Sequence, residues 1–490
     1  MLSSITELDD NLTNRFSKVL EVNPEINRTL VSFQANKSEK GHRWCKYKEA
    51  FSAPLVNHIL NKVEIKEGKI FDPFAGSGTA LFVASELGFE TVGIELLPNS
   101  VEAIEARRLI SESDREWLVN ELRRFMEQKV WEKSGKKKEF SHLRITSGAF
   151  PANEEKLLCR YLYEIELLPD KRLTRILRFA SLCVLEKISF TRKDGQYLRW
   201  DSRSGRRTGG KLFHKGPIPG FTEAITEKIN EIARDVKGEG LLFFDSDNNG
   251  KRGSIELLKG SCHEILPTIK ANSFNGIITS PPYCNRYDYT RTYALELAFL
   301  GVDELTIRKL RQNMLSCTVE NRDKESLNNV YSLDLYKQAL KAFHSQKLLK
   351  RILNYLEECK KNGSLNNNGI PRMVKNYFKE LTLVIFECAR VLKPGAPLVM
   401  VNDNVRYQGA HIPVDLILSD LAEKAGFVVE KIWVLPRGKG NSSQQMGLHG
   451  RKELRKCIYI WRLRDEQAKL QGQQAAYEKS DSQQTLAAHP

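Results

Sequence analysis

Two short apolar segments, separated by a glycine-rich turn and a helical stretch, most constrain how this chain can fold. Residues 69–74 (KIFDPF) and 91–96 (TVGIEL) have the composition of buried strands. The sequence between them opens with AGSGT and continues as an apolar helical pattern at residues 79–87, which Gly88 ends. Strand, turn, helix and strand in this order form the βαβ unit that begins a parallel sheet. The sequence therefore predicts an α/β fold.

The alternation of strands and helices continues in other parts of the chain. Ser52 is a plausible helix cap, and Pro54 would lie in the first turn of the helix that follows it. We expect strands at residues 273–280 and 396–402, helices at 51–63, 381–392 and 413–425, and a closing strand pair at 427–435 and 456–463.

Two stretches interrupt this pattern. Long charged helices are expected at residues 103–133 and 155–186, followed by a basic, glycine-containing segment, and a second helical stretch covers residues 302–376. The sequence predicts one split core with two insertions and a disordered, Gln/Ala/Ser-rich tail. The expected ranges are 1–102, 259–301 and 377–464 for the core, 103–258 and 302–376 for the insertions, and 465–490 for the tail.

Composition limits the class of protein and of partner. The 490 residues carry 76 Lys+Arg against 61 Asp+Glu, a net charge of +15, which favours a polyanionic partner such as nucleic acid. Nine scattered cysteines without metal-ligand spacing favour reduced thiols and predict neither a disulfide framework nor a metal site. No apolar run approaches the ~18 residues of a membrane span. We expect a cytoplasmic protein without membrane association.

The glycine turn indicates a class of ligand. It lacks the Gly-Lys-Ser/Thr ending of a nucleotide-binding P-loop, and Leu81 stands where a dinucleotide fold wants its third glycine. Asp72 would repel a pyrophosphate but attract a cation. Glu95 stands 23 residues after Asp72, near the offset at which an acid binds ribose hydroxyls. S-adenosylmethionine satisfies these requirements; an ordinary turn with two solvated acids is the alternative.

A second motif, Ser280-Pro281-Pro282-Tyr283, follows the expected strand at residues 273–280. Two prolines cannot donate ladder hydrogen bonds, so the chain must leave the sheet at its carboxyl edge, where α/β proteins bind ligands. The Ser280 hydroxyl and the Pro281 carbonyl can accept the N–H groups of an amine that attacks a sulfonium methyl. Tyr283 can stack on a base rotated out of a duplex. A strand-ending turn with a packed tyrosine is the alternative interpretation.

Together, DPFAGSGT and TSPPY resemble the amino-methyltransferases of DNA, which make N4-methylcytosine or N6-methyladenine from S-adenosylmethionine. The resemblance implies a Rossmann-like methyltransferase core and covers roughly residues 40–96, 259–301 and 379–463. It implies a catalytic loop formed by Ser280, Pro281, Pro282 and Tyr283. It implies cofactor contacts from Phe51, Ser52, Asp72, Pro73, Ala75, Gly76, Gly78, Thr79 and Glu95. Ser261 stands where the family often has an acid near the adenine.

The segment 190–215 combines cations with aromatic residues and glycines, which is typical of nucleic-acid contacts. We expect it to belong to a region that recognises double-stranded DNA, although a solvated charge run is the alternative. The loop at residues 436–452 is a weaker candidate. The candidate DNA-binding residues are Arg192, Lys193, Arg199, Arg203, Arg206, Arg207 and Lys211.

The leading hypothesis is a site-specific DNA methyltransferase of a restriction–modification or phage-defence system, with a cognate restriction endonuclease or defence protein as partner. Serine at the first position of the tetrapeptide is commoner among the cytosine-N4 enzymes, so that target is favoured over adenine N6. Cys284 is rejected as a nucleophile, since carbon-5 methylation would need a Pro-Cys dipeptide. An RNA methyltransferase and a non-catalytic nucleic-acid-binding protein with a degenerate cofactor fold remain alternatives.

Overall fold

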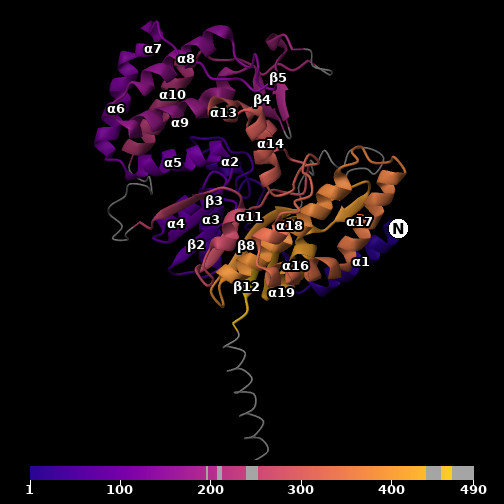
Figure 1. The fold of residues 1–490 in the computed structure, drawn as a ribbon. Helices are drawn as coiled ribbons and strands as arrows, with labels where there is room; N and C mark the ends of the chain where they lie inside the picture. The colour runs from indigo at the N-terminus through magenta and orange to yellow at the C-terminus, as the bar shows by residue number, and fades with distance from the viewer. Residues whose placement is uncertain (195–196, 207–211, 239–251, 437–453, 466–490) are drawn as a thin grey trace, which may run out of the picture.

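The computed structural model describes residues 1–194, 197–206, 212–238, 252–436 and 454–465, and it has two lobes (Figure 1). The lower lobe in the figure is a sheet covered by helices, and the upper lobe is mainly helical. The expected tail at 465–490 lies outside the described residues except for its first residue. The loop at 436–452 likewise lies outside them except for its first residue.

The sheet lobe is built on eight strands in the order β1-β11-β12-β8-β7-β2-β3-β6. All neighbouring pairs are parallel except those that β12 makes with β11 and β8. The α/β fold with a mostly parallel sheet and an antiparallel closing pair is thus confirmed. The strands are β1 (Leu20–Val22), β2 (Lys69–Asp72), β3 (Glu90–Glu95), β6 (Ile255–Lys259), β7 (Gly276–Thr279), β8 (Pro397–Asp403), β11 (Phe427–Val434) and β12 (Lys456–Leu463).

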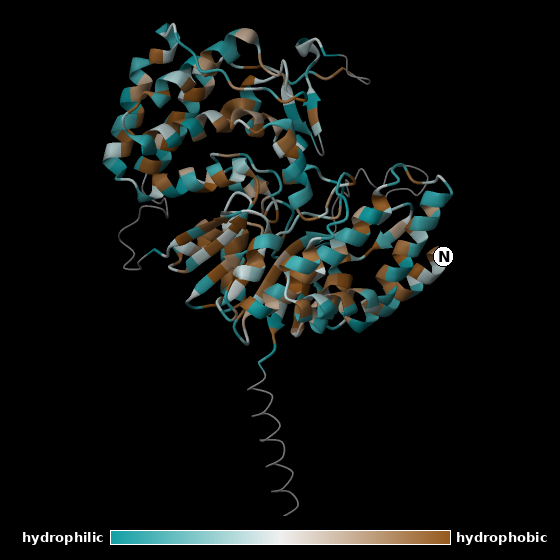
Figure 2. Ribbon diagram, in the orientation of Figure 1, coloured by the Kyte–Doolittle hydropathy of each residue, from teal (hydrophilic) through white to brown (hydrophobic). Residues whose placement is uncertain are grey.

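Helices cover both faces of this sheet, which explains why its central strands are apolar on both sides. One face packs against α3 and α4, and the other packs against α16, α17, α18 and α19. In Figure 2 the strands are mostly brown, whereas the helices alternate brown and teal. The helices of this lobe are α1 (Leu2–Arg15), α3 (Ala53–Lys62), α4 (Thr79–Glu86), α16 (Leu333–Ser345), α17 (Lys347–Lys361), α18 (Ile370–Val391) and α19 (Val414–Lys424).

The helical lobe has its own apolar core. Its helices from the first insertion pack with α13 and α14, which follow the SPPY segment in sequence, and with Trp44 from the N-terminal part. Within the described ranges, no helix combines the length and the apolar character needed to cross a bilayer. The elements are α5 (Pro98–Glu112), α6 (Arg115–Gln128), α7 (Val130–Lys133), α8 (Ala152–Glu166), α9 (Lys171–Ile188), α10 (Phe221–Lys237), α13 (Ala294–Phe299), α14 (Glu304–Asn313) and a hairpin of β4 (Thr191–Asp194) and β5 (Tyr197–Trp200).

Short elements complete the fold around these two cores. A small antiparallel pair, β9 with β10, stands beside the main sheet. The remaining elements are α2 (Phe33–Asn36), α11 (Cys262–Ile265), α12 (Tyr289–Thr292), α15 (Leu327–Val330), β9 (Val405–Tyr407), β10 (Ala410–Ile412) and the 3-10 turns η1 (Ser202–Ser204) and η2 (Leu266–Thr268).

The two long helices expected in the first insertion are divided. Three helices, α5 to α7, occupy the first range because Asp114 accepts from the Trp117 amide and starts α6, and Lys129 at φ 41° ends it. The second range is divided where Asp170 caps α9 by accepting from the Arg172 and Leu173 amides. Local capping therefore overrides the continuous helical pattern.

The expected domain boundaries also differ from the packing. Residues 255–258, assigned by the sequence to the first insertion, form β6 with Lys259 at the edge of the main sheet. The second insertion, 302–376, is not separate, because α16 and α17 share the apolar core beneath the sheet. α18 begins at Ile370, ahead of the expected 381, and its buried face continues through that boundary.

A buried ionic cluster joins the second insertion to the sheet lobe. The Glu380 carboxylate on α18 contacts Lys324 Nζ at 2.5 Å and His263 Nε2 at 3.4 Å, and it accepts from the Ser316 amide at 2.9 Å. These partners outweigh the cost of burial and lower the pKa of Glu380 to about 2. The cluster fixes residues 316–324 against α18.

We predict that Lys324→Met destabilises the protein by about 3–5 kcal/mol, because it leaves the Glu380 charge buried without its cation. The pKa of Glu380 in the folded protein lies below the ordinary 4.5, so its contribution is present above pH 4.5 and is lost as pH falls toward 2. The melting temperature of Lys324→Met should therefore approach that of the wild type in acid. The exposed Lys337→Met is the control; an equal loss in both variants would contradict the role of the cluster.

Candidate functional site

A cavity of about 300 Å³ opens where the central strands of the sheet lobe end. Its wall includes residues at or directly after the carboxyl ends of β2, β3, β7 and β8, the edge at which open α/β sheets bind ligands. Most of the residues expected to bind cofactor or to catalyse line this one cavity. They are Phe51, Asp72, Pro73, Ala75, Gly76, Thr79, Glu95, Ser261, Ser280, Pro281, Pro282 and Tyr283.

Two of the expected residues, Ser52 and Gly78, support the cavity from outside its wall. Ser52 Oγ accepts from the Leu55 amide at 3.2 Å and donates to the Leu30 carbonyl, so it caps α3. Gly78 starts α4 at φ 78°, and a Cβ there would lie 2.9 Å from Ile104 Cγ1. Only glycine fits this conformation and this close approach without strain.

The glycine turn is closed by a hydrogen bond to Glu95. The Gly76 amide, in a residue at φ 55°, donates to one carboxylate oxygen of Glu95 at 2.7 Å. The other oxygen accepts from the Leu97 amide at 2.7 Å. A Cβ at Gly76 would lie 3.3 Å from the Tyr47 ring, so the turn passes close beneath that ring.

Two buried carboxyl groups give the cavity its electrostatic character. Asp72 accepts from Thr279 Oγ1 at 2.6 Å and from the Phe74 amide at 3.0 Å. Burial nevertheless raises the pKa of Asp72 to about 7, and burial likewise raises the pKa of Glu95 to about 7. A cationic ligand with hydroxyl groups would relieve this penalty by favouring the charged form.

The SPPY segment leaves the sheet beside β8. Ser280 Oγ donates to the Val401 carbonyl at 3.1 Å and lies 3.3 Å from Tyr283 Oη. Burial raises the pKa of the Tyr283 hydroxyl well above its usual range, so this side chain is neutral. Cys284 is fully buried, and its carbonyl accepts from Tyr407 Oη at 2.8 Å, which fixes the chain directly after the tetrapeptide.

Ser261 lies at the cavity wall, where Gly260 follows β6. Its hydroxyl donates to the Asn313 carbonyl at the end of α14, at 2.8 Å. This contact connects the core to the helix that descends from the helical lobe.

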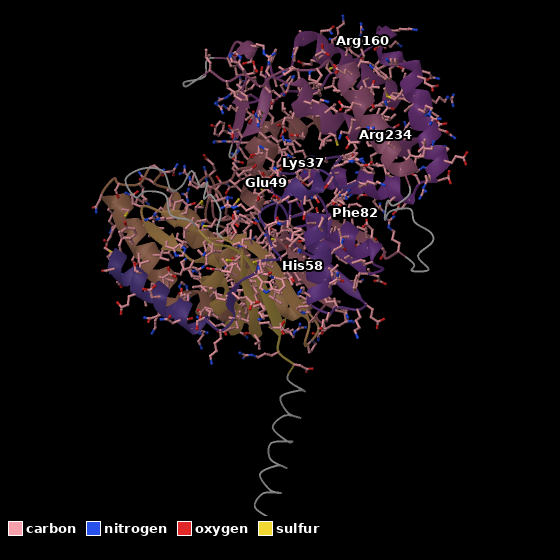
Figure 3. All side chains as sticks on the ribbon, turned by 180° about the vertical axis from the view of Figure 1, so that it is seen from behind. Lys37, Glu49, His58, Phe82, Arg160 and Arg234 are labelled. Carbon is pink, nitrogen blue, oxygen red and sulfur yellow. The ribbon has the colours of Figure 1, made fainter. Side chains whose placement is uncertain are left out.

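An aromatic and acidic part of the wall was missed by the sequence analysis. Tyr47 stacks on Tyr293 with ring centroids 4.9 Å apart, and Tyr293 Oη donates to Glu49 at 2.5 Å. Tyr287 and Tyr289 line the same side, and Glu49 lies near the level where the two lobes meet (Figure 3). The close spacing of aromatic residues just before Phe51 and just after SPPY is the only signal that could have indicated them.

An ion pair that the sequence analysis did not predict lies near Tyr283. Asp403, at the end of β8, forms an ion pair with Lys456 at the start of β12, and both line the cavity. Neither residue belongs to a motif, and only the pairing of β8 with β12 brings them together.

The candidate DNA-binding cations have different environments. On the β4–β5 hairpin, Arg192 is exposed and lies across from Arg199, whose guanidinium pairs with Asp194 at 3.2 Å. Lys193 points the other way, as strand alternation requires. It is 3% exposed and ion-paired with Glu296, so the expectation that it contacts DNA is wrong.

The other arginines of this segment are partly used within the protein. Arg203 pairs with Asp201 at 2.8 Å. Arg206 lies 3.9 Å from the centroid of the Trp200 ring and donates to the Arg144 carbonyl at 2.8 Å. Arg207 and Lys211 lie outside the described residues.

Known proteins resemble this chain over most of its length. The family described as "DNA methylase" matches residues 9–106. "Type II methyltransferase M.AvaI" from Nostoc sp. is 50% identical over 468 residues, which cover 94% of this chain and 94% of the relative. "Type II methyltransferase M.BsoBI" from Geobacillus stearothermophilus is 42% identical over 480 residues, 92% and 91% of the two chains.

A more distant relative is similar over a slightly smaller part of the chain. "Type II methyltransferase M.MvaI" from Kocuria varians is 23% identical over 456 residues, 86% of this chain and 88% of its own. The identity of 50% over nearly the whole chain, the sheet order and the DPFAGSGT and SPPY segments on one cavity agree with one another. The chain belongs to the DNA amino-methyltransferase family.

Proposed function

We propose that this protein transfers a methyl group from S-adenosylmethionine to the exocyclic amino group of a base rotated out of double-stranded DNA, with cytosine N4 as the target. The single observation that carries the proposal is the shared cavity, since the glycine turn with its two acids and the SPPY segment face the same space. The relatives' name, type II methyltransferase, supports a restriction–modification setting with a cognate endonuclease as partner.

The residues of the glycine turn fit S-adenosylmethionine. Gly76, at φ 55° and close beneath Tyr47, keeps the turn free of a side chain. The two buried acids lack a cationic partner among the contacts of the described residues. Glu95 would accept from the ribose hydroxyls, and Asp72 would attract the positively charged methionine end. When bound, S-adenosylmethionine supplies a methyl group on a cationic sulfur.

At the other end of the cavity, the chain would hold the target base. Because the Ser280 hydroxyl donates its hydrogen bond to the Val401 carbonyl, its oxygen lone pairs remain to accept from an amino group, together with the Pro281 carbonyl. Tyr283 would stack on the base. The nitrogen lone pair is thereby freed for attack, and its surplus proton leaves after the N–C bond has formed.

The choice of cytosine depends on Ser280, since serine at this position is commoner among the cytosine-N4 enzymes. Tyr47, Tyr287 and Tyr289, together with Glu49, which accepts from Tyr293 Oη, would form the far wall of the base pocket. Aromatic walls suit a flipped base because every base presents a π-face.

The helical lobe would contact the DNA. Its hairpin presents Arg192 and Arg199 on one side, and Arg203 and Arg206 follow directly in sequence. Arg207 and Lys211 extend the same basic segment in sequence. Phosphate contacts from such cations would position the duplex over the cavity.

The affinity for S-adenosylmethionine should rise as pH increases through about 7, because both carboxyls must be ionised to attract a cation and their pKa values lie there. Below these pKa values, the affinity should rise about tenfold per pH unit for each carboxyl that must ionise. Calorimetry across this range measures it. Glu95→Gln should weaken binding and flatten the profile, whereas the exposed Glu90→Gln should not; a pH-independent affinity in the wild type would refute the role of the two acids.

Ser280→Ala should lower kcat by about 10²-fold, the scale seen when one preorganised transition-state hydrogen bond is removed. Tyr283→Ala should lower methyl transfer similarly, whereas Tyr283→Phe keeps a stacking ring and should retain most of it. Neither Ala variant should change the calorimetric affinity for S-adenosylmethionine. Loss of cofactor binding in Ser280→Ala would show that Ser280 belongs to the cofactor subsite and would refute its proposed role at the target base.

Labelled S-adenosylmethionine, DNA of varied sequence and hydrolysis to nucleosides test the activity itself. N4-methylcytosine is the expected product. N6-methyladenine would overturn the base assignment, and preferential labelling of RNA in competition would overturn the choice of nucleic acid. Cofactor binding without methyl transfer to any nucleic acid would indicate a non-catalytic binding protein and refute the proposed activity.

A further inference from the structure

A short segment, residues 41–51, connects the helical lobe to the cavity, and we call it the strap. Its first half is held by the helical lobe: Trp44 Nε1 donates to Asp235 at 2.8 Å, and Lys46 pairs with Glu186 at 3.0 Å. Its second half, from Tyr47 to Phe51, lines the cavity. Any change in how the strap sits on the helical lobe therefore reaches the cavity wall within a few residues.

Two cysteines lie where the strap meets α9. Cys45 belongs to the strap and Cys183 to α9, and the ion pair between the adjacent Lys46 and Glu186, at 3.0 Å, holds the two segments together. The two cysteines line a second cavity of about 240 Å³, away from the first, together with Lys46, Glu186 and Lys193. Of the nine cysteines these two are partly exposed, and the other seven are buried.

The surroundings make the two thiols unequal. The neighbouring Cys183 thiol lowers the pKa of Cys45, and Lys193 and Lys228 lower it further against burial and Glu296. Burial raises the pKa of Cys183, with Glu231 adding to the rise and Lys228 opposing it. Cys45 is thus the one of the two thiols that ionises more readily, and the thiolate is the form that attacks.

We propose that Cys45 and Cys183 are an oxidation site that peroxides convert to a reversible disulfide between the strap and α9. The Cys45 thiolate attacks one peroxide oxygen, the O–O bond breaks, and Cys45 becomes a sulfenic acid as hydroxide leaves. Cys183 sulfur then attacks the sulfenic sulfur, and its proton leaves with the hydroxyl group as water. The two thiols are oxidised by two electrons and the peroxide is reduced.

The disulfide would alter the cavity through the strap. Forming an S–S bond requires the two sulfurs to approach to about 2.05 Å, closer than the sulfurs of two free thiols can lie. Cys45 would move toward α9, and Tyr47, two residues later, would shift over the glycine turn whose Gly76 it covers. Because small displacements in a site lower transfer rates strongly, we expect methyl transfer to fall by roughly tenfold or more on oxidation.

The experiment treats the full-length protein with hydrogen peroxide, blocks the remaining thiols and maps the peptides by mass spectrometry. We expect two of nine thiols to be lost and one cross-linked peptide pair, containing Cys45 and Cys183, that dithiothreitol separates. Sulfinic acid without a cross-link, a cross-link through other cysteines, or nine intact thiols would each overturn the proposal.

Activity provides the second readout, and this arm rests on the proposed function. Reduced Cys45→Ser and Cys183→Ser should transfer methyl groups as the wild type does, and peroxide should not inhibit either variant. If peroxide inhibits both variants as much as the wild type, the peroxide-sensitive group lies elsewhere in the protein. If the cross-linked wild type keeps full activity, the disulfide does not alter the cavity. A reduced wild type without any methyl transfer would refute the proposed function, while the peptide map still decides the oxidation site.

Discussion

The hydrogen bond between the Gly76 amide and the Glu95 carboxylate ties the turn after β2 to the end of β3. Neighbouring parallel strands then end at one level, and the residues after β7 and β8 reach the same space. The left-handed backbone at Gly76 and Gly78 permits this closure, because a side chain at either position would be strained and would meet Tyr47 or Ile104. The cavity thus depends on two glycines more than on any group that it presents to a ligand.

The electrostatics follow from the same closure. Glu95 is oriented by backbone amides and not by a cation, and Asp72 is held by Thr279 and the Phe74 amide. Backbone donors orient a carboxylate without neutralising it, so burial still raises both pKa values to about 7. The site is consequently arranged to gain from a positive ligand.

The glycine turn, the SPPY exit and the closing strand pair were predictable because each is encoded by adjacent residues. β6 was not, since its edge position leaves Ile255–Lys259 only partly buried and without an apolar run. Tyr47 and Glu49 were missed because the strap is placed by contacts with Asp235 and Glu186 in a distant segment. Lys193 was misassigned because charge alone does not reveal which face of a hairpin is buried.

The buried ion pair between Lys193 and Glu296 has a geometrical consequence for any nucleic acid that reaches the hairpin. Glu296 lies on α13, which follows the SPPY segment in the chain, so the hairpin is braced against the segment that leaves this tetrapeptide. The ion pair holds the hairpin at a fixed distance from the cavity. The distance from the hairpin to the mouth of the cavity is thus set by the fold of this chain and not by anything that binds to it.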